Sequence, residues 1–184
     1  MTSVHLLHAG YAEGDGHVGS SVTLVRDGDA IIVMDPGMVA HRSRILDPLR
    51  EHGVAPEAVT HVVLSHHHPD HTMNVALFEH AEVIDFWARY VGDLWLDNDG
   101  DGHLVGPRSR MLLTPGHTAE DVTLVVEADD AVYALTHLWW YGDRTPEIDP
   151  FADDQSTLEA SRARILDIAD IVIPGHGPSF RVRG

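Results

Sequence analysis

Three short histidine-bearing turns, each behind an apolar run, constrain the fold of this chain more than any other feature of its sequence. The first is His66-His67-His68-Pro69-Asp70-His71, and the others are Pro115-Gly116-His117 and Pro174-Gly175-His176. Histidine is the commonest metal-ligating side chain, and aspartate adds an anionic oxygen. The first turn alone could be a solvated polar loop, but all three turns follow strand-like runs. We expect them to meet at one edge of a sheet, where sites of layered α/β proteins collect.

Apolar runs bounded by Gly, Pro and Asp predict the strands. They cover residues 4–7, 21–25, 30–34, 61–64, 82–84, 111–113, 122–126, 131–135 and 171–173. Polar turn residues at 26–29 and 128–130 predict hairpins.

Two helices are expected in the first half of the chain. Ile45, Leu46 and Leu49 form an apolar stripe at helical spacing, and Gly53 stands where a helix C-cap belongs. A second, short helix is expected over residues 70–79, because Pro69 suits the first turn of a helix.

A third helix is expected near the end of the chain. Ser156 is its predicted N-cap, Glu159 would complete a capping box, and Leu158, Ile165 and Leu166 would share its buried face. Strands that alternate with helices and hairpins predict helices packed outside sheets. The length predicts a single domain over residues 1–184.

The charge of the chain and the residue types it lacks exclude several functions. Its 12 basic residues are all arginine against 29 acidic residues, which gives a formal charge of −17, and it has neither lysine nor cysteine. Lysine and cysteine nucleophiles, disulfides and thiolate metal sites are therefore excluded. Because nucleic-acid binding needs a basic surface, we expect no nucleic-acid partner. No apolar run is long enough to cross a bilayer and the start lacks a signal-peptide pattern, so we expect a cytoplasmic protein without a membrane partner.

The histidine motifs together resemble the metallo-β-lactamase superfamily. They read His66-x-His68-x-Asp70-His71, Thr-Pro-Gly-His117-Thr and Pro-Gly-His176-Gly. The run Val33-Met34-Asp35-Pro36-Gly37 is similar to the strand that ends in Asp-x-Gly in that superfamily. The resemblance covers nearly the whole chain. It implies an α/β fold, namely an αββα sandwich of two mixed β-sheets with helices on the outer faces, and a site at one edge of the sheets.

The resemblance also implies which residues bind metal. In the superfamily's pattern, His66, His68 and His117 would hold a first metal. Asp70, His71 and His176 would hold a second, and Asp35 would support these ligands from behind.

Such a ligand set predicts both the metal and its chemistry. Nitrogen and oxygen ligands with open positions suit catalytic zinc, and paired metals can bridge a hydroxide and polarise a carbonyl or phosphoryl oxygen. We expect one or two Zn2+ ions, with Fe or Mn as alternatives, and Asp70 as the catalytic residue that accepts a proton. His67 points the opposite way from its neighbours in an extended chain, so we do not expect it to be a ligand.

His137 departs from the superfamily's pattern. A bridging Asp normally follows the penultimate core strand, and at that point this sequence reads Leu135-Thr136-His137. A carboxylate has two oxygens and can join two cations, whereas a neutral imidazole offers one nitrogen to one metal. We include His137 among the candidate metal ligands; the alternative is a packed core histidine.

A metal-dependent hydrolase is the favoured function. Metal-bound water would be the nucleophile, and the substrate would be a small ester, thioester or lactone. Trp139, Trp140 and Tyr141 follow His137 directly and are candidates for the substrate pocket, together with the other two tryptophans. The expected partner is a small-molecule substrate, and a homodimer is compatible with the sequence.

Three other functions are compatible with the same motifs. Residues 169–182 resemble an animal branch of the superfamily that is linked to RNA cleavage, which implies a metal-dependent nuclease or phosphodiesterase. A nitrogen-rich ligand set also suits a non-haem iron oxidoreductase. The replacement of the bridging Asp by His137 suits a non-catalytic metal-binding protein.

Overall fold

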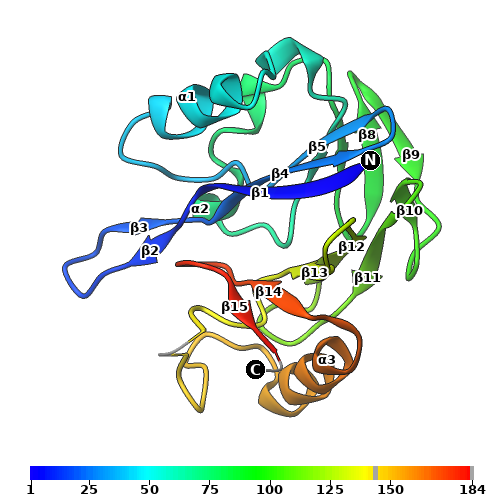
Figure 1. The fold of residues 1–184 in the computed structure, drawn as a ribbon. Coiled ribbons are helices and arrows are strands. Elements are labelled where there is room, and N and C mark those ends of the chain that lie inside the picture. Colours follow the sequence, from blue (N-terminus) through cyan, green and yellow to red (C-terminus); the bar gives the residue numbers. More distant parts are fainter. Residues whose placement is uncertain (143–144, 183–184) are drawn as a thin grey trace.

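The computed structural model describes residues 1–142 and 145–182, which form two packed β-sheets with helices outside them (Figure 1). The seven-stranded sheet contains, in spatial order, β1 (Thr2–His8), β4 (Val22–Asp27), β5 (Ala30–Met34), β6 (His61–Val63), β7 (Glu82–Ile84), β8 (Ala88–Val91) and β9 (Leu94–Asp97). The six-stranded sheet contains β10 (Leu104–Gly106), β11 (Ser109–Leu113), β12 (Val122–Glu127), β13 (Val132–Leu135), β14 (Ile171–Ile173) and β15 (Phe180–Arg181).

A separate hairpin and five helical segments complete the described chain. The hairpin consists of β2 (Tyr11–Ala12) and β3 (Val18–Gly19) and projects from one edge of the sheets (Figure 1). The helices are α1 (Ser43–Glu51), α2 (Pro69–Thr72) and α3 (Gln155–Ile168), with the 3-10 turns η1 (Pro56–Ala58) and η2 (Val75–Leu77). In the part of the chain that the structure describes, no helix has the length and apolar character to cross a membrane.

Alternation of side chains along the strands divides the core into three layers. Val63 and Leu124 belong to the apolar cluster that fills the space between the two sheets. Leu49 of α1 packs on the outer face of the seven-stranded sheet, and Leu158 and Ile165 of α3 pack on the outer face of the six-stranded sheet. Figure 1 shows α1 above one sheet and α3 below the other. The predicted αββα sandwich of mixed sheets is confirmed.

The direction of a few strands places the histidine turns. β5 runs parallel to β6, and β13 runs parallel to β14, so the carboxyl ends of each pair lie at one edge of their sheet. β11 and β13 are both antiparallel to β12 and therefore point the same way. The turns that follow β6, β11 and β14 carry the predicted ligands. The pairing thus brings together turns that are far apart in the sequence.

The first predicted helix is confirmed, including its end. Gly53 adopts a left-handed conformation with φ of +69°, as expected just after a helix C-cap. The backbone N–H groups of Gly53 and Val54 donate to the carbonyls of Arg50 and Leu49 at 2.8 and 3.1 Å, which satisfies the last turn of α1.

The helix predicted over residues 70–79 is wrong. α2 ends at Thr72, and only the single turn of η2 follows it. Asn74 interrupts the helix because it is tied to the loop after β5: its backbone N–H donates to the carbonyl of Pro36 at 2.8 Å, and its side-chain amide donates to that of Gly37 at 2.6 Å. These tertiary hydrogen bonds replace the next helical turn.

The capping box predicted for the third helix is also wrong. The N-cap is Asp154, whose carboxylate accepts from the backbone N–H of Thr157 at 2.8 Å. Ser156 lies inside the first turn and donates to that same carboxylate, while Glu159 accepts from the side chain of Gln155. Asp154 has the extended backbone that an N-cap requires, and Asp is as favourable an N-cap as Ser.

The third helix also buries a narrower face than predicted, which gives a stability test. Leu158 is 0% exposed and Leu166 is 37% exposed. Leu158→Ala should lower the free energy of unfolding by about 2–5 kcal/mol, because it removes buried methyl groups and leaves a cavity. Leu166→Ala should cost less than about 1 kcal/mol, because that side chain is already in contact with water. Urea unfolding measures both variants, and equal losses would contradict the observed orientation of α3.

Candidate metal centre

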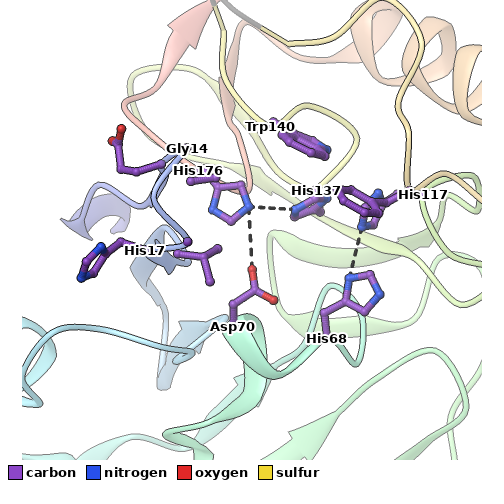
Figure 2. Close-up of a pocket in the computed structure, with 13 residues that line it drawn as sticks. Gly14, His17, His68, Asp70, His117, His137, Trp140 and His176 are labelled. Carbon is purple, nitrogen blue, oxygen red and sulfur yellow. Dashed lines mark hydrogen bonds and ion pairs between the residues drawn. The ribbon is translucent and has the colours of Figure 1, made fainter.

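The three predicted histidine turns meet at one edge of the sheets (Figure 2). In the first group, Nε2 of His66 and Nε2 of His117 lie 3.0 and 3.3 Å from Nδ1 of His68. His66 and His68 come from the turn after β6, and His117 comes from the turn after β11. These three nitrogens face one another although the two turns are about fifty residues apart.

A second group adjoins the first. One carboxylate oxygen of Asp70 lies 3.4 Å from Nε2 of His71 and 3.8 Å from Nε2 of His176. Asp70 and His71 belong to α2, and His176 follows β14. All six residues that the resemblance implied as ligands therefore lie close together, and their division between two metals stays a prediction.

The outward-facing ring nitrogens are held by hydrogen bonds. Nδ1 of His71 donates to a carboxylate oxygen of Asp35 at 2.8 Å, and Nδ1 of His176 donates to the carbonyl of Gly19 at 2.9 Å. Nδ1 of His66 lies 2.9 Å from the hydroxyl of Ser65. Partners of this kind fix the tautomer and orientation of metal-binding histidines and leave the inner nitrogens free.

Asp35 lies behind the site, as the sequence predicts. Its carboxylate accepts from the backbone N–H and the hydroxyl of Ser65, both at 2.7 Å, in addition to His71. Asp35 has φ of +51°, a rare conformation for a residue other than glycine. The nearby position 37 must be glycine, because the backbone of Asp70 packs so closely against Gly37 that any side chain at this position would collide with it.

Asp149 holds His117, a role that its sequence context did not predict. One of its carboxylate oxygens accepts from Nδ1 of His117 and from the indole N–H of Trp140, both at 3.0 Å. Its side chain is 0% exposed. The only local signal was an aspartate before a proline in a polar segment, which is equally typical of a surface turn.

His137 lies between the two groups. It takes part in two clusters of buried histidines whose ligand atoms lie within 4.8 Å of one another, one with His66 and His117 and one with His71 and His176. Its Nε2 is 3.3 Å from Nε2 of His176. His137 therefore lies beside the candidate ligands, and its ligation of metal, against the alternative of a packed core histidine, stays a prediction.

His67 is directed away from the ligand groups. Its ring nitrogens lie 3.0 Å from a carboxylate oxygen of Asp85 and 3.4 Å from one of Glu120. The ring stacks on Trp87, with centroids 4.7 Å apart. The opposite orientation expected for this residue is therefore observed.

Only one of the predicted pocket aromatics lines the cavity beside the site. This cavity of about 560 Å³ is bounded by Trp140, Phe151, ligand candidates and the β2–β3 hairpin (Figure 2). Trp140 stacks on Phe151 at 5.6 Å with an interplanar angle of 10°. Trp139 instead packs in the core against α3, and Tyr141 faces a neighbouring pocket behind the hairpin. Trp95 is 66% exposed on β9 and does not line the cavity.

Burial keeps most of these imidazoles neutral. It lowers the pKa values of His66, His137 and His176, in the last case to about 4, and neighbouring imidazoles lower them further. Burial also lowers the pKa of His71, but the carboxylates of Asp35 and Asp70 outweigh it and raise that pKa to about 9. Burial opposes ionisation of Asp70, yet its contacts with His71 lower its pKa to about 2.

The donor set fits divalent cations. Nε2 of His71 and Nδ1 of His137 are buried and make no hydrogen bond within residues 1–142 and 145–182. Each buried polar atom left in that state costs about 1–3 kcal/mol. A cation among the inner nitrogens and the Asp70 carboxylate would satisfy such atoms. It would displace the proton that the raised pKa of His71 retains, because neutral imidazoles and an ionised carboxylate are the forms that bind metal.

Comparison with known proteins identifies the family. Residues 15–87 match the model of the metallo-beta-lactamase superfamily. The chain is 35% identical over 191 residues to metallo-beta-lactamase domain-containing protein 1 of Xenopus laevis, and the alignment covers 98% of this chain and 82% of the frog protein. The chain belongs to the metallo-β-lactamase superfamily. The chain spans a smaller share of the mammalian proteins of the same name, 65% of the human one.

Two further similar proteins extend the comparison. Thioesterase pkgB of Emericella nidulans is 27% identical over 178 residues, which cover 93% of this chain and 50% of the fungal protein. A metallo-β-lactamase family protein of Thermus thermophilus superposes with a TM-score of 0.72 at 19% identity, covering 98% of this chain and 75% of the other. This structural likeness establishes the superfamily's fold.

The lowered pKa values predict that the metal-free protein loses stability in acid. Below pH 6.5, His66, His137 and His176 bind fewer protons in the folded state than in the unfolded state. Their contribution to the free energy of unfolding is therefore present above that pH and is lost as the pH falls toward 4. His71 has a raised pKa of about 9, so its contribution is lost only as the pH rises through that value. Asp121, whose pKa burial raises to about 6, opposes the acid loss. We expect the three histidines to outweigh it.

Melting curves of the chelator-treated protein between pH 7 and pH 4 test this expectation. The melting temperature should fall across the window, since each pKa unit corresponds to about 1.4 kcal/mol, or roughly 2–5 °C. His137→Leu should flatten the profile, because it removes one histidine that must remain neutral when folded. His80→Gln is the control, because the His80 side chain is 64% exposed. A flat native profile would contradict the prediction.

Proposed function

We propose that this protein is a metal-dependent hydrolase of a small ester, thioester or lactone, with one or two Zn2+ ions as cofactor. The observation that carries the proposal is the convergence of inward-facing nitrogens and the Asp70 carboxylate beside a cavity with an aromatic wall. The superfamily contains metal-dependent hydrolases, and one relative is named as a thioesterase. Fe and Mn are the alternative metals, since nitrogen-rich ligand sets also bind them.

Each group of side chains has its own part in the proposed site. His66, His68 and His117 would hold one cation, and Asp70, His71 and His176 a second. When bound, such cations act as Lewis acids on a carbonyl oxygen and lower the pKa of water. Asp70 has a pKa of about 2, so its carboxylate is ionised at neutral pH and is a weak base. We therefore propose that Asp70 binds metal and orients a water molecule through a hydrogen bond, in preference to a role as proton acceptor.

The cavity favours an apolar, uncharged acyl substrate. Trp140 and Phe151 form a flat aromatic wall, and Val18 and the backbone of Gly14 and Gly16 contribute from the hairpin opposite. The formal charge of −17 opposes the approach of a polyanion, which makes the nuclease alternative less favourable. A small-molecule substrate is thus the partner that we propose.

Turnover of a substrate panel tests the hydrolase. The Zn2+-loaded protein should cleave nitrophenyl esters, acyl thioesters or lactones, and chelation should abolish the activity. Asp70→Asn should lower kcat/KM by more than about 100-fold, because even residues behind metal ligands are worth 10–100-fold. Asp47→Asn is the matched control, since the Asp47 side chain is 60% exposed on α1. Cleavage of a phosphodiester but of no acyl substrate would favour the nuclease, and oxygen-dependent turnover with bound iron would favour the oxidoreductase.

Because His137 stands where a bridging carboxylate is usual, we expect the two metal positions to differ in their affinity for Zn2+. Its ring lies in both histidine clusters, but a neutral imidazole has one lone pair for one cation. Without a bridging carboxylate, two cations would repel each other more strongly. Calorimetric titration of the metal-free protein should show one tight Zn2+ site and a second that is weaker or absent. His137→Asp should strengthen the second site, and two equally tight sites in the native protein would contradict the prediction.

A further inference from the structure

Asp149 connects a candidate ligand with the wall of the cavity. Its Oδ2 accepts from Nδ1 of His117 and from Nε1 of Trp140, both at 3.0 Å, and its Oδ1 accepts from the backbone N–H of Phe151 at 2.9 Å. Nε2 of His117 faces the first ligand group, and Trp140 and Phe151 are the stacked aromatic rings of the cavity. One buried carboxylate therefore contacts both functional parts of the site.

The segment around Asp149 is itself fixed to the turn of His117. The backbone N–H of Asp153 donates to the carbonyl of His117 at 3.1 Å, and that of Asp154 donates to the carbonyl of Gly116 at 3.2 Å. The side chain of Gln155, the first residue of α3, accepts from the backbone N–H of Asp149 at 3.0 Å. The carboxylate thus sits on a backbone that cannot move independently of the histidine that it holds.

The surroundings of Asp149 stabilise its ionised form. Burial would raise the pKa of Asp149, but the hydrogen bonds from His117 and from the Phe151 amide outweigh it and lower that pKa. Arg162 also places a positive charge near it, while donating to the carbonyl of Leu138 at 2.7 Å. An ionised acceptor makes hydrogen bonds about twice as strong as a neutral one.

We propose that Asp149 is a positioning residue that fixes His117 in the tautomer with a proton on Nδ1, so that Nε2 faces the metal position, and that fixes the plane of Trp140 in the cavity wall. The role in the cavity wall rests on the hydrolase function proposed above. The role in the tautomer of His117 does not. Ligand orientation and the shape of the substrate cavity are consequently set by the same carboxylate.

The tautomer of His117 is the first measurement. In the metal-free protein labelled with ¹⁵N, side-chain NMR should show His117 protonated at Nδ1, with the signal assigned through the spectrum of His117→Phe. Asp149→Ala should shift this signal toward a mixture of tautomers. Asp153→Ala is the matched control, because Asp153 lies in the same segment and its carboxylate accepts from the backbone N–H of Ala119 at 3.0 Å instead of from the histidine ring. An unchanged tautomer in Asp149→Ala would overturn the proposal.

Metal affinity is the second measurement. Competition with a chelator should show Zn2+ binding about 10–100-fold weaker in Asp149→Ala and unchanged in Asp153→Ala. If Asp149→Ala does not fold, Asp149→Asn decides the matter: the amide keeps the size of the side chain but loses its charge, and binding should be about 10-fold weaker. Native Zn2+ affinity in Asp149→Asn would overturn the proposal, as a purely structural role predicts a lower melting temperature without weaker binding.

Kinetics separate the two effects on an acyl substrate that the native protein cleaves. Trp140→Phe keeps the aromatic ring and removes the indole N–H, so it should raise KM while the tautomer of His117 and the Zn2+ affinity remain native. Asp149→Ala should change both kcat and KM. If the native protein cleaves no acyl substrate but its tautomer and Zn2+ affinity depend on Asp149, the hydrolase fails and the positioning of His117 stands. If turnover is observed and Asp149→Ala changes none of these quantities, the positioning role fails and the hydrolase stands.

Discussion

The hydrogen bonds behind the imidazoles of His71, His117 and His176 are the interactions on which the geometry of this site depends. A partner on the outer nitrogen fixes the tautomer and the orientation of the ring, so that the other nitrogen faces inward. The parallel pairing of β5 with β6 brings Asp35 to His71, and the β2–β3 hairpin brings the carbonyl of Gly19 to His176. The segment before α3 brings Asp149 to His117. The fold thus places these hydrogen-bond partners at the edge of the two sheets where the histidines lie.

The sequence predicted the inner residues of the site far better than the outer ones. A run such as His66–His71 carries its signal within six positions, and the Pro-Gly-His turns repeat it. The partners have no such local signal, because Gly19 is 157 residues from His176 and Asp149 is 32 residues from His117. Asp35 was predicted only because its strand resembles that of a known family. The same limitation applies to the aromatics: neighbouring positions in a chain point to different sides, so Trp140 reaches the cavity and Trp139 does not.

Hydrophobic patterning predicted the elements that are fixed by burial in the core. It failed where single polar contacts determine where a helix begins or ends. The predicted strands are all observed, because their apolar faces fill the layers between and outside the sheets. The strands of the β2–β3 hairpin, β8 to β10 and β15 were missed, since short or exposed edge strands bury little apolar surface. Asn74 ended a helix through bonds to a distant loop, and Asp154 replaced Ser156 as a cap. Neither choice is visible in hydrophobic spacing.

The attachment of Asp149 to the first turn of α3 has a consequence for how the protein fails on heating. Helix ends fray with lower free energies than those needed to open a sheet. The first turn here depends on one side-chain cap, Asp154, whose neighbours also bind the backbone of the His117 turn. Opening of that turn would release the histidine while both sheets remain intact. We therefore expect the orientation of His117 to be lost at a lower temperature than the one at which the sandwich melts.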